Sequence, residues 1–115
     1  MEIIREKIAL ADLKKMSLKM FESIVKAVVD VEKEIMVVDA GMHADQEELL
    51  LNNDSKQENL WGINLHPEDY GTDAFVEFYS MINIRPSCGN SSRSVNNPQL
   101  QNKIKTIVHR LVVTP

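Results

Sequence analysis

Stretches rich in valine and isoleucine predict most of the strands of this chain. Segments 24–31 and 35–42 are separated by three charged residues and therefore predict a hairpin. Segments 60–66 and 75–85 alternate between apolar and polar side chains, which is typical of strands with one buried face. A further short strand is expected at residues 2–5.

Apolar side chains at spacings of three and four predict helices over residues 9–21 and from Pro98 onward. Proline suits the first turn of a helix, because its missing N–H would have no partner there. A shorter helix is expected at about residues 46–53. Its start has a capping-box pattern, in which Asp45 is the N-cap and Glu48 reaches back to it.

The predicted elements follow the order β-α-β-β-α-β-β-α. This order favours the α+β class, with a single mixed sheet of about four to five strands and three helices packed mostly on one face. A chain of 115 residues is a normal size for one domain and too short for two ordinary ones. We therefore expect one α+β domain over residues 1–115.

Alternation also predicts which side chains of the second strand pair face the core, because successive residues of a strand point to opposite faces. Asn64, Asn83 and Arg85 then share the opposite, polar face. The predicted inward set is Trp61, Ile63, Leu65, Phe78, Ile82 and Ile84.

Composition narrows the class of protein. No apolar run approaches the roughly 18 residues of a membrane-spanning helix, and the charged start does not resemble a signal peptide. The only cysteine is Cys88, which excludes an internal disulfide and a cysteine-based zinc site and fits a reducing cytoplasm. We therefore expect a cytoplasmic protein without a membrane partner.

Charge is distributed unevenly along the chain. The net charge of −4 argues against nucleic acid as a partner. Residues 85–115 nevertheless contain basic side chains and no acidic one, whereas most of the charged side chains in residues 30–84 are acidic. The basic segment therefore meets either an anionic ligand or the acidic middle of its own chain.

Five blocks of the chain resemble, as a set, a family of small prokaryotic proteins with no assigned function. The resemblance covers about residues 1–112 and implies a cytoplasmic protein with one domain, without indicating a reaction, cofactor or partner. Two positions depart from the family's pattern: Ser91 stands where Arg is usual, and Cys88 stands where another residue is usual. The blocks are 25–32 (VKAVVDVE), 43–45 (HAD), 60–67 (LWGINLHP), 80–86 (SMINIRP) and 89–93 (GNSSR).

The strongest candidate site is the run of residues 83–93. Arg85 and Arg93 can each bind an anion through two parallel hydrogen bonds. Backbone N–H groups of the Gly/Ser/Asn loop between them can donate to the same anion. The alternative is an ordinary polar sheet face and a solvated loop, in which asparagine side chains brace the turn. The predicted ligand-binding residues are Asn64, Asn83, Arg85, Asn90 and Arg93.

Acid–base and metal chemistry have weaker candidates. His66 and Glu77 lie on neighbouring predicted strands and could exchange a proton with a substrate. His43, Asp45 and Glu48 are close in sequence, but capping explains the two acids, and the spacing lacks the His pair or Cys/His framework of a zinc site. We expect no metal and no cofactor.

Three functions remain open. The favoured one is a small binding module with a site for a small anionic ligand, with a homo-oligomer as one possible assembly. The second is a hydrolase of a phosphorylated or nucleotide-like substrate, in which the arginines stabilise charge and His66 or Glu77 transfers a proton. The third is a regulatory protein whose acidic middle segment contacts a basic partner.

Overall fold

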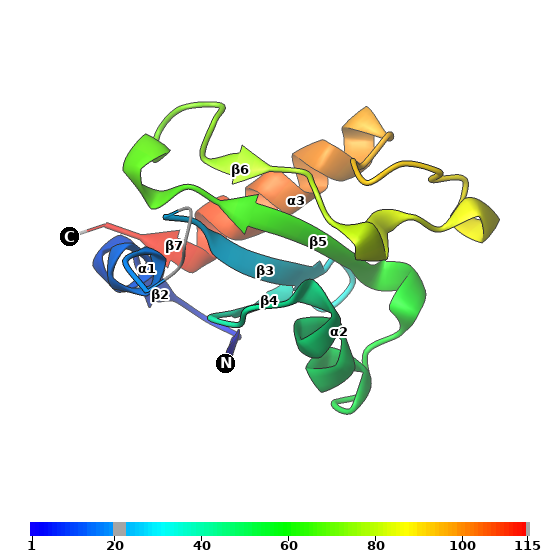
Figure 1. Ribbon diagram of the computed structural model, residues 1–115, viewed down its shortest axis with the longest axis horizontal. Coiled ribbons are helices and arrows are strands. Elements are labelled where there is room, and N and C mark those ends of the chain that lie inside the picture. The colour runs from blue at the N-terminus through cyan, green and yellow to red at the C-terminus, as the bar shows by residue number, and fades with distance from the viewer. Residues whose placement is uncertain (20–22, 115) are drawn as a thin grey trace.

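The computed structural model describes residues 1–19 and 23–114, and its fold belongs to the α+β class, as predicted (Figure 1). The described part contains three α-helices, α1 (Leu10–Ser17), α2 (His43–Leu51) and α3 (Pro98–Leu111). Its strands are β1 (Glu2–Ile4), β2 (Ile8–Ala9), β3 (Val25–Asp30), β4 (Ile35–Val38), β5 (Leu60–Leu65), β6 (Val76–Glu77) and β7 (Val112–Val113). Short 3₁₀ helices lie at Gln57–Asn59, Pro67–Asp69, Met81–Asn83 and Pro86–Cys88.

Five strands form one antiparallel sheet in the order β1-β4-β3-β5-β6. Strands β2 and β7 form a separate parallel pair, in which Ile8 lies opposite Val112. The expectation of a single mixed sheet is therefore wrong. The second sheet joins segments from the two ends of the chain, and two-residue strands are too short to leave a periodic pattern in the sequence.

Hydrophobic clusters cover both faces of the main sheet. Helices α1 and α3 pack on one face, where Leu13 and Ile107 meet the side chains of β3, β4 and β5. Helix α2 packs on the other face, where Leu50 contacts Val28 and Leu60. In Figure 1, α2 lies in front of the sheet and α3 lies behind it. Two of the three helices thus share one face, as the order of elements favours.

The predicted facing of β5 is confirmed. Trp61, Ile63 and Leu65 are buried in the cluster that α1 and α3 cover. Asn64 points to the opposite face, where it lies across from Lys26 of β3. Phe78 packs against the predicted cluster and is only partly buried.

The predicted strand 75–85 is mostly wrong, because only Val76 and Glu77 pair with β5. The chain then turns into the 3₁₀ helix Met81–Asn83, which breaks the alternation of strand residues. As a result Ile82 packs on the side of α2, and Ile84 is 41% exposed, so neither lies in the predicted core.

Helix α2 begins earlier than predicted. Its N-cap is Met42, which makes no side-chain capping bond, and Asp45 lies within the first turn, so the prediction of Asp45 as N-cap is wrong. The buried His43 ring shares a hydrogen bond of 2.7 Å with the carbonyl oxygen of Ile63, which fixes the helix start against β5. The predicted first helix also included Met20 and Phe21, which lie outside the described residues.

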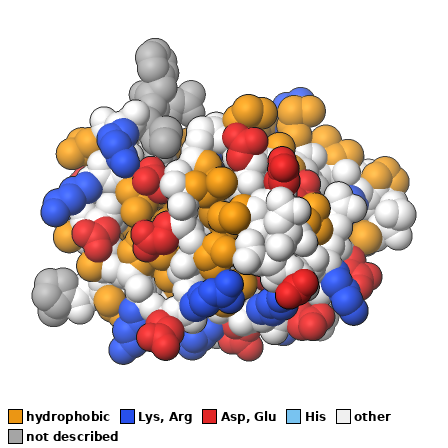
Figure 2. Space-filling view, turned by 90° about the horizontal axis from the view of Figure 1, so that it is seen from below, with side chains coloured by type: hydrophobic (Ala, Val, Ile, Leu, Met, Phe, Trp, Pro, Cys, Tyr) orange, Lys and Arg blue, Asp and Glu red, His pale blue; other side chains and the backbone are white. Residues whose placement is uncertain are grey.

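The surface face drawn in Figure 2 carries hydrophobic side chains along its middle, with side chains of both charge signs around them. Charges of one sign do not gather on this face, so it offers no extended field for a highly charged partner. Across residues 1–19 and 23–114, no helix combines the length and the hydropathy needed to cross a membrane.

Candidate ligand-binding site

Asn83 holds the loop after β6 against the main sheet. This residue is fully buried, and its side-chain amide donates to the carbonyl oxygen of Gly62 at 2.9 Å. Its Oδ1 accepts the N–H of Gly62 at 2.8 Å, and its amide also donates to the carbonyl of Arg93 at 3.0 Å. The side chain of Asn83 therefore has no free donor with which to contact a ligand.

Arg85 is likewise engaged by the protein's own backbone. Its Nε donates to the carbonyl of Ile82 at 3.2 Å, and its two terminal nitrogens donate to the carbonyls of Gln57 and Leu60. The guanidinium lies over the ring of Trp61, with its central carbon 4.4 Å from the ring centroid. Arg85 is only 8% exposed, and this burial lowers its pKa. Arg85 therefore ties β5 to the loop.

Asn90 and Arg93, the other two predicted loop contacts, differ in their surroundings. The amide of Asn90 donates to the carbonyls of Asn83 and Ser94, both at 2.7 Å, and so braces the loop from inside. Arg93 is exposed and donates to the hydroxyl of Tyr79 at 2.8 Å. The guanidinium groups of Arg85 and Arg93 thus contact different aromatic rings.

A pocket of about 510 Å³ opens where the start of α2, the end of β5 and the segment after β6 meet. Apolar and polar side chains both line it, and the polar ones come from β3, β5, β6, the start of α2 and the segment after β6. The lining residues are Ile24, Lys26, Met42, His43, Ala44, Asn64, Glu77, Tyr79, Ser80, Met81 and Ile82. Two residues predicted for the site, Asn64 and Glu77, therefore line a real concavity.

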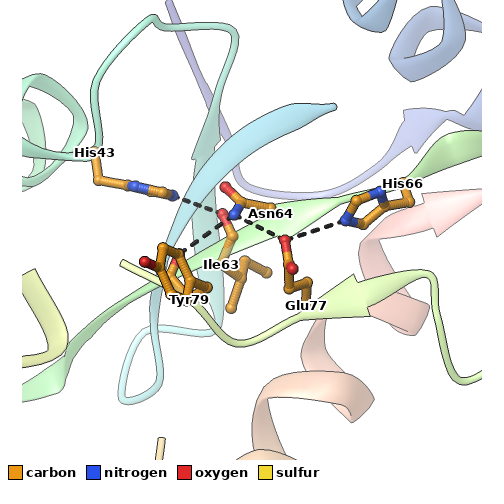
Figure 3. Close-up of polar contacts among 6 residues, drawn as sticks. All are labelled: His43, Ile63, Asn64, His66, Glu77 and Tyr79. Atoms are coloured by element: carbon orange, nitrogen blue, oxygen red, sulfur yellow. Dashed lines mark hydrogen bonds and ion pairs between the residues drawn. The ribbon is translucent and has the colours of Figure 1, made fainter. Parts of the chain in front are cut away.

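A chain of polar contacts crosses the edge of this pocket (Figure 3). The amide of Asn64 donates to Glu77 Oε1 at 3.0 Å and to the carbonyl of Tyr79 at 3.4 Å. His66 Nε2 lies 3.2 Å from the same carboxylate oxygen. The hydrogen bond from Asn64 is the main cause that lowers the pKa of Glu77, and His66 contributes further. The structure thus brings the predicted acid–base pair into contact.

The side-chain oxygen of Asn64 has no hydrogen-bond partner, although the residue is only 6% exposed. Its orientation is fixed, because a flipped amide would place this oxygen against the carboxylate of Glu77. In Figure 3 the oxygen points away from Glu77, toward the side on which His43 lies. A buried acceptor without a hydrogen bond destabilises the fold, so a ligand or an ordered water is expected to donate to this oxygen.

His43 supplies a second acceptor to the pocket. A carbonyl oxygen can only accept, so the contact with Ile63 requires that the proton sits on Nε2. Burial lowers the pKa of His43, and the nearby charge of Lys26 lowers it further, so the ring is neutral and Nδ1 is an acceptor. No described residue donates a hydrogen bond to Nδ1.

The pocket is also lined by two positively charged groups, the start of α2 and Lys26. Met42, His43 and Ala44 bring the start of α2 to its wall, and Met42 leaves the first-turn N–H groups without a side-chain cap. Such a helix end carries a partial positive charge and attracts anions. The half-buried Lys26 lines the same pocket.

Sequence reasoning missed His43 and Lys26 as members of the site. In the sequence His43 stands beside Asp45 and Glu48, and Lys26 is one charged residue on a predicted strand. Neither had a signal in the sequence, because their proximity depends on how α2 docks on β3 and β5. Over the described ranges, no three His, Cys, Asp or Glu side chains gather closely enough to hold a metal ion.

Comparison with known proteins places the chain in a family without assigning an activity. A search of curated proteins and a search of solved structures each found no match. One family model, described as a protein of unknown function (DUF5674), matches residues 2–111, which is nearly the whole chain. The chain therefore belongs to the DUF5674 family.

Proposed function

We propose that this protein is a binding module that takes a small anionic molecule in the pocket between α2 and β5. The observation that carries this proposal is the uncapped start of α2, which lines the pocket together with Lys26. The unpaired Oδ1 of Asn64 independently supports an occupied pocket, because a buried acceptor without a partner favours a ligand donor or an ordered water.

The proposed site keeps some of the residues expected from the sequence and reassigns others. Asn64 contacts the ligand, whereas Arg93 does not line the pocket and only contacts Tyr79, which does. Asn83, Arg85 and Asn90 support the site indirectly, since their side chains are bonded to backbone groups. Anion binding thus depends on Lys26 and on backbone N–H groups more than on the arginines.

Calorimetric titration with inorganic phosphate and with ribose 5-phosphate tests this proposal. Loss of the Lys26 charge in Lys26→Met should weaken binding about tenfold, since a charged hydrogen bond contributes roughly 1.5–3 kcal/mol. The matched control is Lys103→Met, which removes an exposed charge of α3 that does not line the pocket. Equal weakening in both variants would show that only overall charge matters, and the proposed pocket would be wrong.

A second function is favoured by one contact, the 3.2 Å separation of His66 and Glu77 at the pocket edge. A carboxylate can orient an imidazole for proton transfer, as a hydrolase of a phosphorylated substrate requires. Incubation with bis-p-nitrophenyl phosphate distinguishes the two functions. A binding module shows no turnover, whereas turnover that disappears in His66→Ala would select the hydrolase.

A further inference from the structure

The polar atoms inside this pocket restrict the ligand further, provided that the proposed function is correct and an anion binds there. Asn64 Oδ1 is a buried acceptor without a donor among the described residues. His43 Nδ1 is a second acceptor on a residue that lines the pocket, and it is left available because Nε2 donates to Ile63. The oxygens of an anion would satisfy Lys26 and the start of α2, but these two acceptors need hydrogen-bond donors instead. A ligand that also carries donor groups pairs them in place of ordered water.

The walls of the pocket add a second restriction. Met42 and Met81 line it and are unusually exposed for methionine, at 58% and 68%. Tyr79 completes the apolar rim, and Ile24 and Ile82 lie among the other lining residues. Methionine sulfur and tyrosine rings pack well against flat aromatic groups. These walls suit a planar ring better than a branched or fully polar ligand.

Access to the buried acceptor requires a rearrangement of the pocket lining. The Oδ1 of Asn64 is shielded from solvent, so a ligand donor reaches it only when a neighbouring side chain moves. Methionine is unbranched and has three rotatable bonds, so Met42 and Met81 can rearrange at small cost.

We propose that the ligand is a phosphorylated heteroaromatic amine of the nucleoside monophosphate class. Its ring lies between the exposed methionines and Tyr79, and the two hydrogens of its ring amino group donate to Asn64 and His43. Its phosphate lies near Lys26 and the first turn of α2. A volume of about 510 Å³ is large enough for a ligand of this size.

Titration of the wild-type protein with four probes, monitored by calorimetry and by amide chemical shifts, tests the proposal. The probes are AMP; purine riboside 5′-monophosphate, which lacks only the amino group; ribose 5-phosphate, which lacks the ring; and adenosine, which lacks the phosphate. We expect AMP to bind about tenfold more tightly than the analogue without the amino group, because that analogue leaves the buried Oδ1 of Asn64 without a donor. Ribose 5-phosphate should bind more weakly still.

Asn64→Leu provides the matched variant, because it removes the acceptor and nearly keeps the side-chain volume. In this variant the preference for AMP over the analogue without the amino group should fall well below tenfold, because only His43 still accepts from the amine. The control Asn102→Leu changes an exposed asparagine of α3 outside the pocket and should keep the tenfold preference. An undiminished tenfold preference in Asn64→Leu would overturn the role assigned to Asn64.

The outcomes separate this inference from the proposed function. If ribose 5-phosphate binds as tightly as AMP, the ring and amine are irrelevant and this inference is wrong, while anion binding stands. If adenosine binds as tightly as AMP, the phosphate contributes nothing and the anion proposal is wrong, and with it the nucleotide class. If none of these probes binds, both proposals are wrong.

Discussion

The side-chain amide of Asn83 and the main chain of Gly62 exchange two hydrogen bonds, of 2.8 and 2.9 Å. A neighbouring strand would offer β5 the same pair of groups, one donor and one acceptor. Strand β6 pairs only with Asn64 and Leu65, so the amide of Asn83 continues the ladder where β6 has left it. The loop that follows is thereby held against the sheet beside the pocket.

Replacing Asn83 by alanine should destabilise the protein strongly. The change leaves the buried N–H and C=O of Gly62 without partners, at a cost of about 1–3 kcal/mol for each group. Urea unfolding measures the loss as a lower free energy of unfolding. Asn53→Ala is the control, since its amide bonds one exposed carbonyl, and it should cost less than about 1 kcal/mol. Equal costs for the two variants would contradict the role of Asn83.

Gly62 should tolerate no larger side chain. A Cβ atom at this position would lie 2.5 Å from the Cβ of Ser80, which is attached directly to the backbone and cannot rotate away. We expect Gly62→Ala to cost about 1–3 kcal/mol through this overlap. Gly41→Ala is the control, because nothing lies within 4 Å of its added Cβ. A thermal melt that leaves Gly62→Ala unchanged would contradict this close approach.

Arg85→Lys should lower stability although it keeps the charge. Lysine has one ammonium group, which cannot reach the carbonyls of Ile82, Gln57 and Leu60 together. We expect a loss of about 2 kcal/mol or more in the free energy of unfolding. The exposed Arg93→Lys should change it by less than about 0.5 kcal/mol. If Arg85→Lys instead leaves stability intact and weakens phosphate binding, Arg85 is a ligand contact after all.

His43 should make stability depend on pH. Burial lowers its pKa below the usual 6.5, so between the two values the unfolded chain binds a proton that the folded chain does not. This contribution is complete above pH of about 6.5 and is lost as the pH falls through the lowered pKa. Urea unfolding between about pH 5 and pH 8 should show a slope that His43→Gln reduces. His109→Gln is the control and should retain the slope.

Two turns should respond oppositely to glycine and alanine. Asp54 has φ of +71° in the turn after α2, and Gly89 has φ of +76° in the loop after Arg85. Glycine adopts these angles without the crowding that a Cβ causes, at a difference of about 1 kcal/mol. Asp54→Gly should therefore raise the melting temperature, and Gly89→Ala should lower it. The same direction of change in both would show that contacts, rather than backbone angles, dominate there.

Local pattern determined the elements whose stability depends on their own residues. Helix α3 begins at Pro98 as predicted, and the side chain of Asn97 accepts the N–H groups of its first turn. The pairing of β3 with β4 follows from two adjacent apolar segments with a short polar connection. The burial of Trp61, Ile63 and Leu65 also follows from alternation, which places these three side chains on one face of β5, and that face packs against α1 and α3.

Only the tertiary structure decided what the polar residues do. The bonds of Asn83 to Gly62 and of His43 to Ile63 join positions about twenty residues apart, and alternation does not report such partners. No sequence pattern predicts the hydrogen bonds of Arg85, because its three partners are backbone carbonyls, which every residue has. Alternation predicts that Asn64 lies on the polar face of β5. That its oxygen is unpaired depends on the position of Glu77, which accepts from the amide nitrogen and so fixes the orientation of the amide. Periodicity reports which face a side chain takes, whereas the docking of α2 and the loop determines which atoms remain free for a ligand.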